Sequence, residues 1–291
     1  MVAAGGVLFF SFPRVYSAGF SGFYLALIVV LWLLVLRGLA MELRSHLDNP
    51  LWRTFWDKAF GVASLLLSLV LGVALGNVVR GVPLNGDGYF FIAWWTDLRP
   101  GPTPGILDWY TILMGLLGVA VLALHGANYL AMKTEGAIHD RAAWLASRAI
   151  WIALALSIVT VGVAPDVQPL FVRRYVEQPV GFVLPAASTI LLLSTFYFRV
   201  RKQDVAAFLA SSGFILAAIG STAWGLYPRI LIATTDPANS LTIENSATSP
   251  YGQQIGLAWF AVGAALAIAY ATFVYRSFRG KTQLPAGGHG Y

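Results

Sequence analysis

Seven apolar segments, each long enough to form a helix that crosses a bilayer at about 20 residues, dominate this 291-residue chain. The chain is 58% hydrophobic and only 11% charged, whereas a soluble domain carries about 25% charged residues. We therefore predict an all-α, polytopic membrane helix bundle that forms a single membrane domain over residues 1–291. The predicted spans are 18–39, 59–79, 106–131, 144–164, 180–198, 205–227 and 254–275.

Basic residues predict how these spans are oriented. Most of the 19 Lys and Arg residues lie in or next to 40–58, 132–148, 199–204 and the tail 276–291. The positive-inside rule places such segments in the cytoplasm. We therefore expect residues 1–17 outside and the tail inside, and we attribute the net charge of +6 to this topology rather than to nucleic-acid binding.

The chain begins with an apolar segment that is too short to cross a bilayer, because residues 3–12 end at Pro13. Its first residues carry neither a basic region nor a small-residue cleavage site, so they do not resemble a signal peptide. We expect residues 1–17 to be the remnant of a truncated N-terminal region, with a span or half-span upstream of Met1.

The most informative stretch is 125–141, where a long apolar helix runs into two His, a Lys, a Glu, an Asp and an Arg. Ionisable groups inside membrane spans are costly and mark candidate sites, so His125 is a candidate haem ligand. A haem with two axial ligands needs an opposing His or Met. The other histidines lie in loops or the tail, and Met114 is on the same predicted helix. We therefore expect His125 to be a hydrogen-bonded packing residue rather than a cofactor ligand.

Metal binding is not expected either. The absence of cysteine excludes thiolate ligands and iron–sulfur clusters, and Glu135 with His139 offers only two ligands one helical turn apart. We expect these two side chains to pair with each other if the helix continues through them. Lys133 and Arg141 are then interpreted as topology anchors.

Five other polar residues are predicted to have structural roles. Asn77 and Asn128 lie inside predicted spans and are candidate interhelical hydrogen-bond donors, worth about 0.6 to 2 kcal/mol each in lipid. Arg37, Glu42 and Arg44 are predicted to fix the inner interface. No Asp or Glu lies in the core of a predicted span, which disfavours a self-contained proton relay or ion-coupled transport.

Three segments carry packing information. Gly72 and Gly76 have the small-residue spacing that lets two helices approach closely. Loop 81–105 is rich in Gly, Pro and aromatic residues and is predicted to form a cap at the headgroup level. Loop 228–252 is long and polar, so we predict that it folds over another part of the protein. The connection 199–204 is short enough to make the fifth and sixth spans antiparallel neighbours.

Six blocks of sequence, in this order along the chain, resemble subunit II of the cytochrome bd quinol oxidases. They are Phe-Pro-Arg-Val-Tyr-Ser-Ala-Gly-Phe-Ser-Gly-Phe-Tyr (12–24), Leu-Arg-Gly-Leu-Ala-Met-Glu-Leu-Arg (36–44), Trp-Asp-Lys-Ala-Phe (56–60), Gly-Asn-Val-Val-Arg-Gly-Val-Pro (76–83), His-Gly-Ala-Asn-Tyr-Leu-Ala-Met-Lys-Thr-Glu-Gly (125–136) and Asn-Ser-Leu-Thr-Ile-Glu-Asn-Ser-Ala (239–247). The resemblance therefore covers nearly the whole chain.

The resemblance implies a terminal oxidase complex that oxidises membrane quinol and reduces O2 to water. In that family the haems, of types b and d, and the quinol site belong to subunit I. The resemblance thus implies that this chain is a haem-free accessory subunit in a heterodimer with subunit I, in a bacterial cytoplasmic membrane. It also implies contact with lipid and the quinol pool, and it leaves open a quinone or lipid at the surface of this subunit.

The chain departs from the family at its start. Family members have eight spans and, before the block that matches residues 5–16, an additional helix and a Trp-Asp-Gly-Asn segment whose acid is associated with proton access to the haems. That role is therefore not carried over. Two alternatives remain open at this point, a multi-span secondary transporter or channel and a stand-alone haem enzyme that uses His125.

Overall fold

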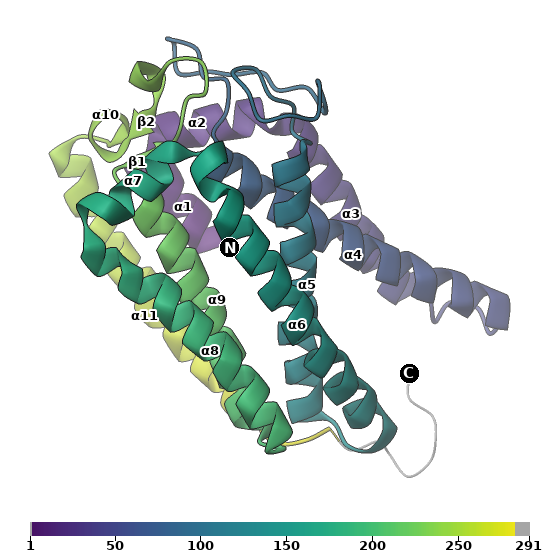
Figure 1. Cartoon of the computed structure of the whole chain (residues 1–291). Coiled ribbons are helices and arrows are strands. Elements are labelled where there is room, and N and C mark those ends of the chain that lie inside the picture. The colour runs from purple at the N-terminus through teal and green to yellow at the C-terminus, as the bar shows by residue number, and fades with distance from the viewer. Residues whose placement is uncertain (1, 283–291) are drawn as a thin grey trace.

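The computed structural model describes residues 2–282, and within them seven helices are long and apolar enough to cross a membrane. They are α3 (Tyr24–Leu43), α4 (Pro50–Arg80), α5 (Trp109–Lys133), α6 (Gly136–Val167), α8 (Val183–Val200), α9 (Asp204–Leu226) and α11 (Pro250–Ser277). The prediction of a polytopic all-α bundle is confirmed (Figure 1).

Shorter elements lie mainly at one end of the bundle. They are α1 (Val2–Ser11), α2 (Pro13–Gly22), α7 (Pro169–Glu177), the 3-10 helices η1 (Pro179–Phe182) and η2 (Pro237–Asn239), α10 (Ile243–Ser246) and the antiparallel strands β1 (Arg229–Leu231) and β2 (Leu241–Thr242). Following the topology prediction, we call this end the outer end. The inner end is the one where α5 turns into α6 and α8 turns into α9 (Figure 1).

The first predicted span, 18–39, is wrong at its start, because the helix is interrupted at Phe23. Residues before it belong to α2 and residues after it to α3. Helix α2 lies across the outer end (Figure 1), where Ala18 is fully buried. A Cβ at Gly22 would overlap the ring of Phe90, so the end of α2 is fixed by contact with a loop. Hydropathy alone merges this buried helix with the span that follows.

The predicted inner connections are also much shorter than expected, because the helices continue beyond their apolar parts. Within 40–58 only residues 44–49 lie outside helices. Helix α4 starts early because the Asn49 side chain accepts hydrogen bonds from the backbone N–H groups of Leu51 and Trp52, which satisfies donors that a helix start leaves unpaired.

Close backbone contact joins α4 to α5. A Cβ on Gly72 would lie only 2.5 Å from the carbonyl oxygen of Met114 and 2.8 Å from the Cα of Gly115. From the other side, a Cβ on Gly118 would lie 3.0 Å from the Cα of Gly72. The predicted role of the Gly72–Gly76 spacing in close helix packing is therefore confirmed.

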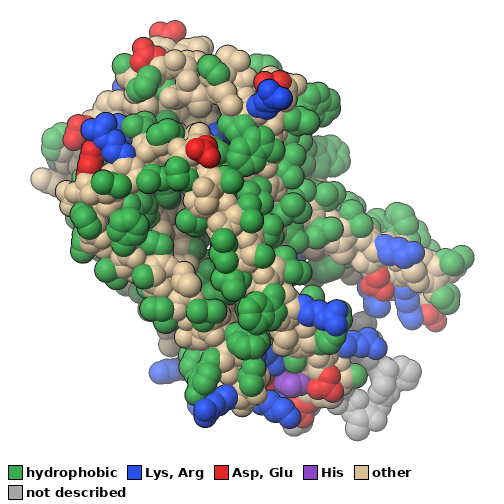
Figure 2. All heavy atoms as spheres, viewed as in Figure 1, with side chains coloured by type: hydrophobic (Ala, Val, Ile, Leu, Met, Phe, Trp, Pro, Cys, Tyr) green, Lys and Arg blue, Asp and Glu red, His purple; other side chains and the backbone are tan. Residues whose placement is uncertain are grey.

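Helices α5, α6, α8 and α9 surround a second region of close packing. Its buried side chains are mainly alanines with a few large apolar residues, namely Ala120, Leu124, Ala127, Ala146, Ala149, Ile150, Ala153, Leu192 and Phe214. The residues between α8 and α9 form only a tight turn, and α8 and α9 pack against each other as predicted. Figure 2 shows hydrophobic side chains along the length of the bundle and Lys and Arg side chains gathered at the inner end.

Candidate functional site

The two long outer loops fold onto each other and form a cap. Val82 donates a backbone hydrogen bond to Ile232 (2.9 Å) and accepts one from Thr234 (2.9 Å), while the Thr235 hydroxyl donates to the carbonyl of Leu84 (2.5 Å). We call residues 81–107 and 228–249, together with α2, the outer cap. The first loop is folded, as predicted, and the second loop folds over it. The position of this cap at the headgroup level stays a prediction.

A hydrophobic core holds the outer cap together. Its buried members come from α2, α4 and both loops, namely Val15, Ala18, Val73, Val82, Leu84, Phe90, Ile92, Ile106, Leu231, Ala233 and Leu241. The cap starts at Gly81, which has φ +102°, a backbone conformation that side chains disfavour. A Cβ there would also lie 2.9 Å from the carbonyl oxygen of Ile232, so both conformation and packing require glycine.

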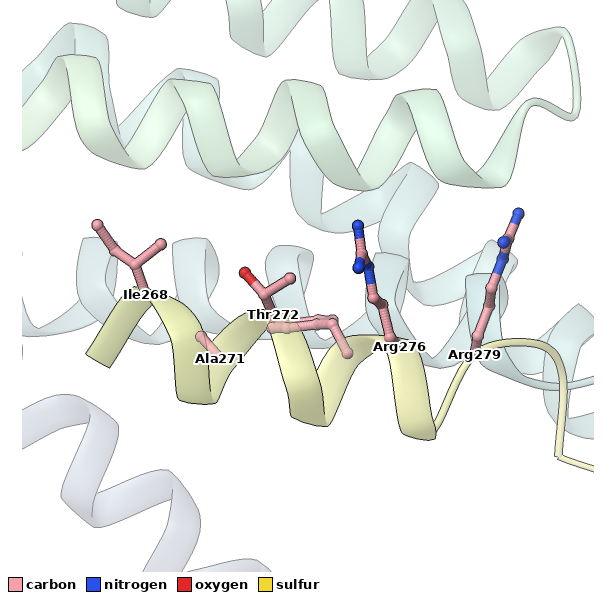
Figure 3. A pocket seen from close by; sticks show the side chains of 6 residues that line it. Ile268, Ala271, Thr272, Arg276 and Arg279 are labelled. Carbon is pink, nitrogen blue, oxygen red and sulfur yellow. The ribbon is translucent and has the colours of Figure 1, made fainter. Parts of the chain in front are cut away.

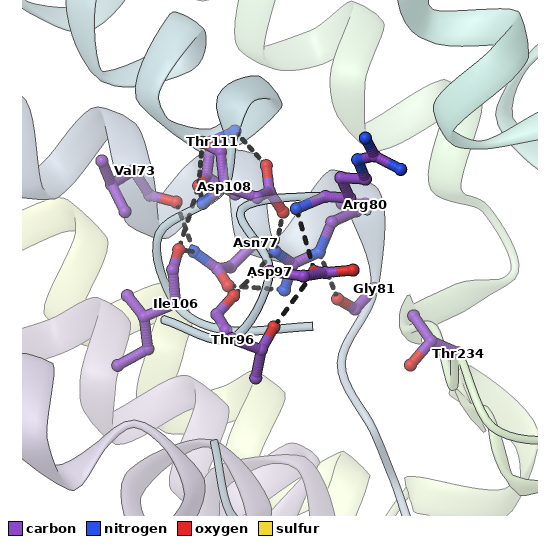
Figure 4. Close-up of polar contacts among 12 residues, drawn as sticks. Val73, Asn77, Arg80, Gly81, Thr96, Asp97, Ile106, Asp108, Thr111 and Thr234 are labelled. Atoms are coloured by element: carbon purple, nitrogen blue, oxygen red, sulfur yellow. Dashed lines mark hydrogen bonds and ion pairs between the residues drawn. The ribbon is translucent and has the colours of Figure 1, made fainter. Parts of the chain in front are cut away.

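An ion pair is buried directly beneath the outer cap. Arg80 at the end of α4 pairs with Asp108 before α5, and their side chains are 1% and 0% exposed. Arg80 also donates to the carbonyls of Gly105 (2.9 Å) and Gly81 (3.1 Å) and to the Asn77 side-chain oxygen (2.7 Å) (Figure 4). Burial of a charge is tolerated only with such pairing and hydrogen bonding, and the Arg80 side chain has both.

Asp108 has a second function as the N-cap of α5. Its side chain accepts from the backbone N–H of Thr111 (2.8 Å), and the Thr111 hydroxyl accepts from the backbone N–H of Asp108 (2.9 Å). The Asn77 amide donates to the carbonyls of Val73 and Ile106, both at 2.9 Å. We call Asn77, Arg80, Asp108 and Thr111 the buried network.

The buried network fixes the ends of three spans relative to one another. It joins α4 to α5 directly, and the Gln168 side chain, just beyond α6, donates to the carbonyl of Arg80 (2.8 Å). Sequence reasoning does not find this centre, because neither hydropathy nor charge counting pairs Arg80 with a carboxylate 28 positions away. The signal that could have found it is Asp108 three residues before Thr111, the spacing of a capping box.

The two asparagines differ in their contacts. Asn77 reaches beyond its own helix to Ile106, in the segment that leads into α5. The interhelical bond expected of Asn128 is not formed: its amide donates to Leu124 in its own helix (3.0 Å), and its oxygen has no partner within residues 2–282. Both amides donate to the carbonyl one turn earlier in their own helix, but among the described residues only Asn77 also has a carbonyl outside its helix within hydrogen-bond distance.

His125 connects α5 to α9. Its Nδ1 lies 2.9 Å from the hydroxyl oxygen of Ser211, and its ring stacks on Phe208 with centroids 4.9 Å apart. The Ser211 hydroxyl also lies 2.8 Å from the Phe208 carbonyl, and when it donates its proton there, the imidazole is the donor in the bond to Ser211. This is the packing geometry that we expected of His125, and its role in an assembly stays a prediction.

The surroundings of His125 do not fit a haem with two axial ligands. Of the other described histidines, His46 contacts the Glu42 carbonyl (3.3 Å) and His139 contacts carboxylates at the inner end. Met114 packs against Gly76 and belongs to the same helix as His125. Within residues 2–282, no group of three His, Cys, Asp or Glu side chains is placed to hold a metal ion.

The expected pairing of Glu135 with His139 is wrong. The helix does not continue through them, because Glu135 is the N-cap of α6, and its carboxylate lies 3.5 Å from Lys281 instead. His139 Nε2 contacts Asp204 at the start of α9 (3.1 Å), and Asp204 also pairs with Arg199 (2.8 Å). These contacts tie the inner ends of α6, α8 and α9 together.

The remaining predicted residues lie at the inner ends of other helices. Lys133 donates to the carbonyl of Phe278 (2.7 Å) and so ties α5 to the end of α11. Arg44 forms a half-exposed ion pair with Asp57 (2.6 Å), and hydrogen bonding to that carboxylate raises the pKa of Arg44. The Arg37 guanidinium lies 5.3 Å from the centre of the Phe60 ring. Their role at an interface stays a prediction.

Helix α11 is the most exposed span, with no buried residue. A shallow groove of about 570 Å³ runs along its inner half. Figure 3 shows Ile268, Thr272 and Arg276 of α11, and Arg279 just beyond its end, extending to the same side. Because α11 continues to Ser277, the predicted tail 276–291 begins within this helix. The last part of that tail, 283–291, lies outside the described residues.

Comparison with known proteins places the chain in a family. Residues 1–278 match the family described as cytochrome bd terminal oxidase subunit II. A probable cytochrome oxidase subunit 2 of Haemophilus influenzae is 29% identical, over 97% of this chain and 80% of that protein. Cytochrome bd-I ubiquinol oxidase subunit 2 of Escherichia coli is 28% identical, over 90% and 74%.

A solved structure has the same fold. The bd oxidase from Geobacillus thermodenitrificans matches with a TM-score of 0.73 at 17% identity, over 94% of this chain and 78% of the matched chain. The blocks that suggested the family from sequence and the arrangement of helices thus agree with two independent comparisons. The chain belongs to the cytochrome bd terminal oxidase subunit II family.

Proposed function

We propose that this chain is the haem-free, structural subunit of a terminal oxidase that oxidises membrane quinol and reduces O2 to water. In this proposal the haems and the quinol site belong to subunit I, and this chain forms a heterodimer with it in a bacterial cytoplasmic membrane. The chain itself supplies no catalytic residue. The seven spans are explained by family membership, so a transporter or channel is no longer needed to account for them.

The observation that carries the proposal is the family match over residues 1–278. The contacts of the polar residues support it. The Arg80 side chain is held by three hydrogen bonds and an ion pair inside the protein, and His125 contacts Ser211 and Phe208. Groups that are occupied in this way hold helices in place and are poorly suited to binding substrate.

The chemistry of the haems, when bound to the partner, is electron transfer from quinol to O2. What this chain contributes is a rigid partner whose apolar helix faces lie in the membrane and whose outer cap and inner turns fix the helix ends. The positive-inside rule further predicts that α11 ends in the cytoplasm, where Arg276, Arg279 and Lys281 follow one another.

The test is to express the oxidase with and without this chain. We expect that loss of the chain removes the assembled, haem-containing complex from the membrane and abolishes quinol-dependent O2 consumption. The wild-type chain should restore both, and so should His125→Ala, because this histidine holds no haem in the proposal. Assembly and full activity without the chain would contradict it.

A spectrum separates the haem-free subunit from a stand-alone haem enzyme. The purified chain without its partner should show no Soret band, while the complex should show one of the same intensity for wild type and His125→Ala. A Soret band in the isolated chain that disappears in His125→Ala would show that this chain binds haem itself.

A further inference from the structure

Arg174 at the outer end is held by aromatic rings and has no acidic partner. It lies on α7, which connects α6 to α8, and its guanidinium carbon is 4.9 Å from the ring centre of Tyr227 and 5.4 Å from that of Trp224. Both rings come from the end of α9. Within residues 2–282, the Arg174 guanidinium forms no hydrogen bond or ion pair, and its Nε is buried without an acceptor.

Arg173, the preceding residue on the same helix, has an acidic partner that neutralises its charge. Arg173 Nε lies 2.6 Å from the carboxylate of Glu177, one turn further along. Basic residues are disfavoured on the outer side of a membrane protein, so an arginine kept there without a carboxylate calls for another anion. The neighbouring residues Arg173 and Arg174 can therefore be compared directly, since only Arg173 has a carboxylate partner.

Helix α7 lies at the boundary between apolar and polar surroundings. Tyr175 is 5% exposed and its hydroxyl contacts Ser221 on α9 (2.6 Å to the carbonyl oxygen). Val176 on α7 and Val180 and Phe182 on the following η1 are 69%, 65% and 54% exposed. A short amphipathic helix with exposed apolar residues between the outer ends of two spans fits the level where lipid headgroups meet acyl chains.

The aromatic contacts leave the donor edge of the guanidinium available. The two rings lie 5.4 and 4.9 Å from the guanidinium carbon, and the terminal N–H groups, which form no hydrogen bond within residues 2–282, make up the planar fork that matches two phosphate oxygens. The clamp is itself fixed, since a Cβ on Gly181 would overlap the Trp224 indole. Arg174 is thus oriented before any ligand arrives.

We propose that Arg174, clamped by Trp224 and Tyr227, binds the phosphate of an anionic phospholipid in the outer leaflet, with the acyl chains against the exposed apolar residues of α7 and η1. This site is independent of the oxidase role proposed above. It predicts that one lipid is held at a defined place on this subunit, in addition to the general attraction of anionic lipids to the basic inner end.

The test uses the full chain, purified with any subunit that accompanies it and reconstituted with a photoreactive phosphatidylglycerol. Crosslinked peptides are mapped by mass spectrometry. We expect labelling of 169–183 that unlabelled phosphatidylglycerol competes and phosphatidylcholine does not. Arg174→Gln should reduce it about fivefold, the effect of about 1 kcal/mol per arginine near a membrane surface. Arg173→Gln, the matched control, should change it little.

Two more variants distinguish recognition from charge alone. Arg174→Lys keeps the charge but loses the planar fork, so it should give intermediate labelling, and Trp224→Leu should weaken labelling with Arg174 still present. Thermal unfolding of each variant checks that the fold is retained. Equal labelling of Arg174→Gln and wild type would overturn the proposal, as would competition by inorganic phosphate alone or a crosslink from position 174 to a carboxylate of an accompanying subunit.

Discussion

The outer and inner ends of the bundle use charged residues in opposite ways. At the outer end, Arg80 and Asp108 are 1% and 0% exposed and lie beneath folded loops. At the inner end the helices are joined by short turns, and Arg44 and Asp57 remain 46% and 54% exposed. The Arg80–Asp108 pair is part of the packed interior, whereas Arg44 and Asp57 are in contact with solvent or headgroups.

This difference separates stability from topology. A buried ion pair lowers the free energy only while both partners are present, because a single buried charge is strongly unfavourable. An exposed pair contributes little, since water and salt screen it, yet its basic member still determines which side of the membrane a loop occupies. Substitutions in the Arg80–Asp108 pair should therefore affect folding, and substitutions in the Arg44–Asp57 pair should mainly affect orientation.

The largest effect is expected from breaking the buried ion pair. Asp108→Asn or Arg80→Gln should each lower the free energy of unfolding by about 3–5 kcal/mol, measured by equilibrium unfolding in mixed detergent micelles. In the double variant Arg80→Met with Asp108→Asn, no unpaired charge remains. Its loss in free energy of unfolding should therefore be smaller than the sum of the losses of Arg80→Met and Asp108→Asn alone. Single variants within about 1 kcal/mol of wild type would refute the distinction drawn between the two ends.

A somewhat smaller loss is expected where α4 meets α5. Gly72→Leu must displace the backbone at Met114 and Gly115, which should lower the free energy of unfolding by about 1–3 kcal/mol. Gly126→Leu on α5 is the matched control, because nothing lies within 4 Å of a Cβ there. It should stay within about 0.5 kcal/mol of wild type, and similar losses for both variants would count against the contact.

The hydrogen bond between α5 and α9 should contribute less. In a double-mutant cycle of His125→Ala and Ser211→Ala, we expect a coupling energy of about 0.6 kcal/mol, and not above about 1.7 kcal/mol, as for other hydrogen bonds between membrane helices. The same unfolding assay measures it. A coupling energy of zero would mean that the contact at 2.9 Å is fortuitous.

The smallest effect is expected at the inner surface. Arg44→Gln removes the ion pair with Asp57, yet thermal unfolding should match wild type within error at all salt concentrations, because both groups are half-exposed. What should change is orientation: with further basic residues of 40–58 also removed, a reporter fused after α3 should become partly accessible from outside. A large loss of stability for Arg44→Gln alone would contradict the prediction that the exposed pair at the inner end contributes little to stability.

The spans could be predicted from sequence, but their ends and partners could not. Hydropathy finds apolar stretches, and all seven correspond to helices. It does not detect that Asn49 starts a helix within a charged segment or that Glu135 interrupts one. The partners of polar side chains are set by tertiary packing: Arg80 meets a residue 28 positions away, and His125 meets one 86 positions away.

The position of Asp108 has a consequence for how the protein is made. Arg80 is synthesised before Asp108, and on the predicted topology each must reach the outer side of the membrane before they can meet. Until then the guanidinium has no counter-charge at the end of α4. The two helices and the loop between them are therefore expected to enter the membrane as one hairpin, whose insertion is complete only when the carboxylate arrives. The ion pair then works against reversal, because withdrawing α5 would leave Arg80 unpaired.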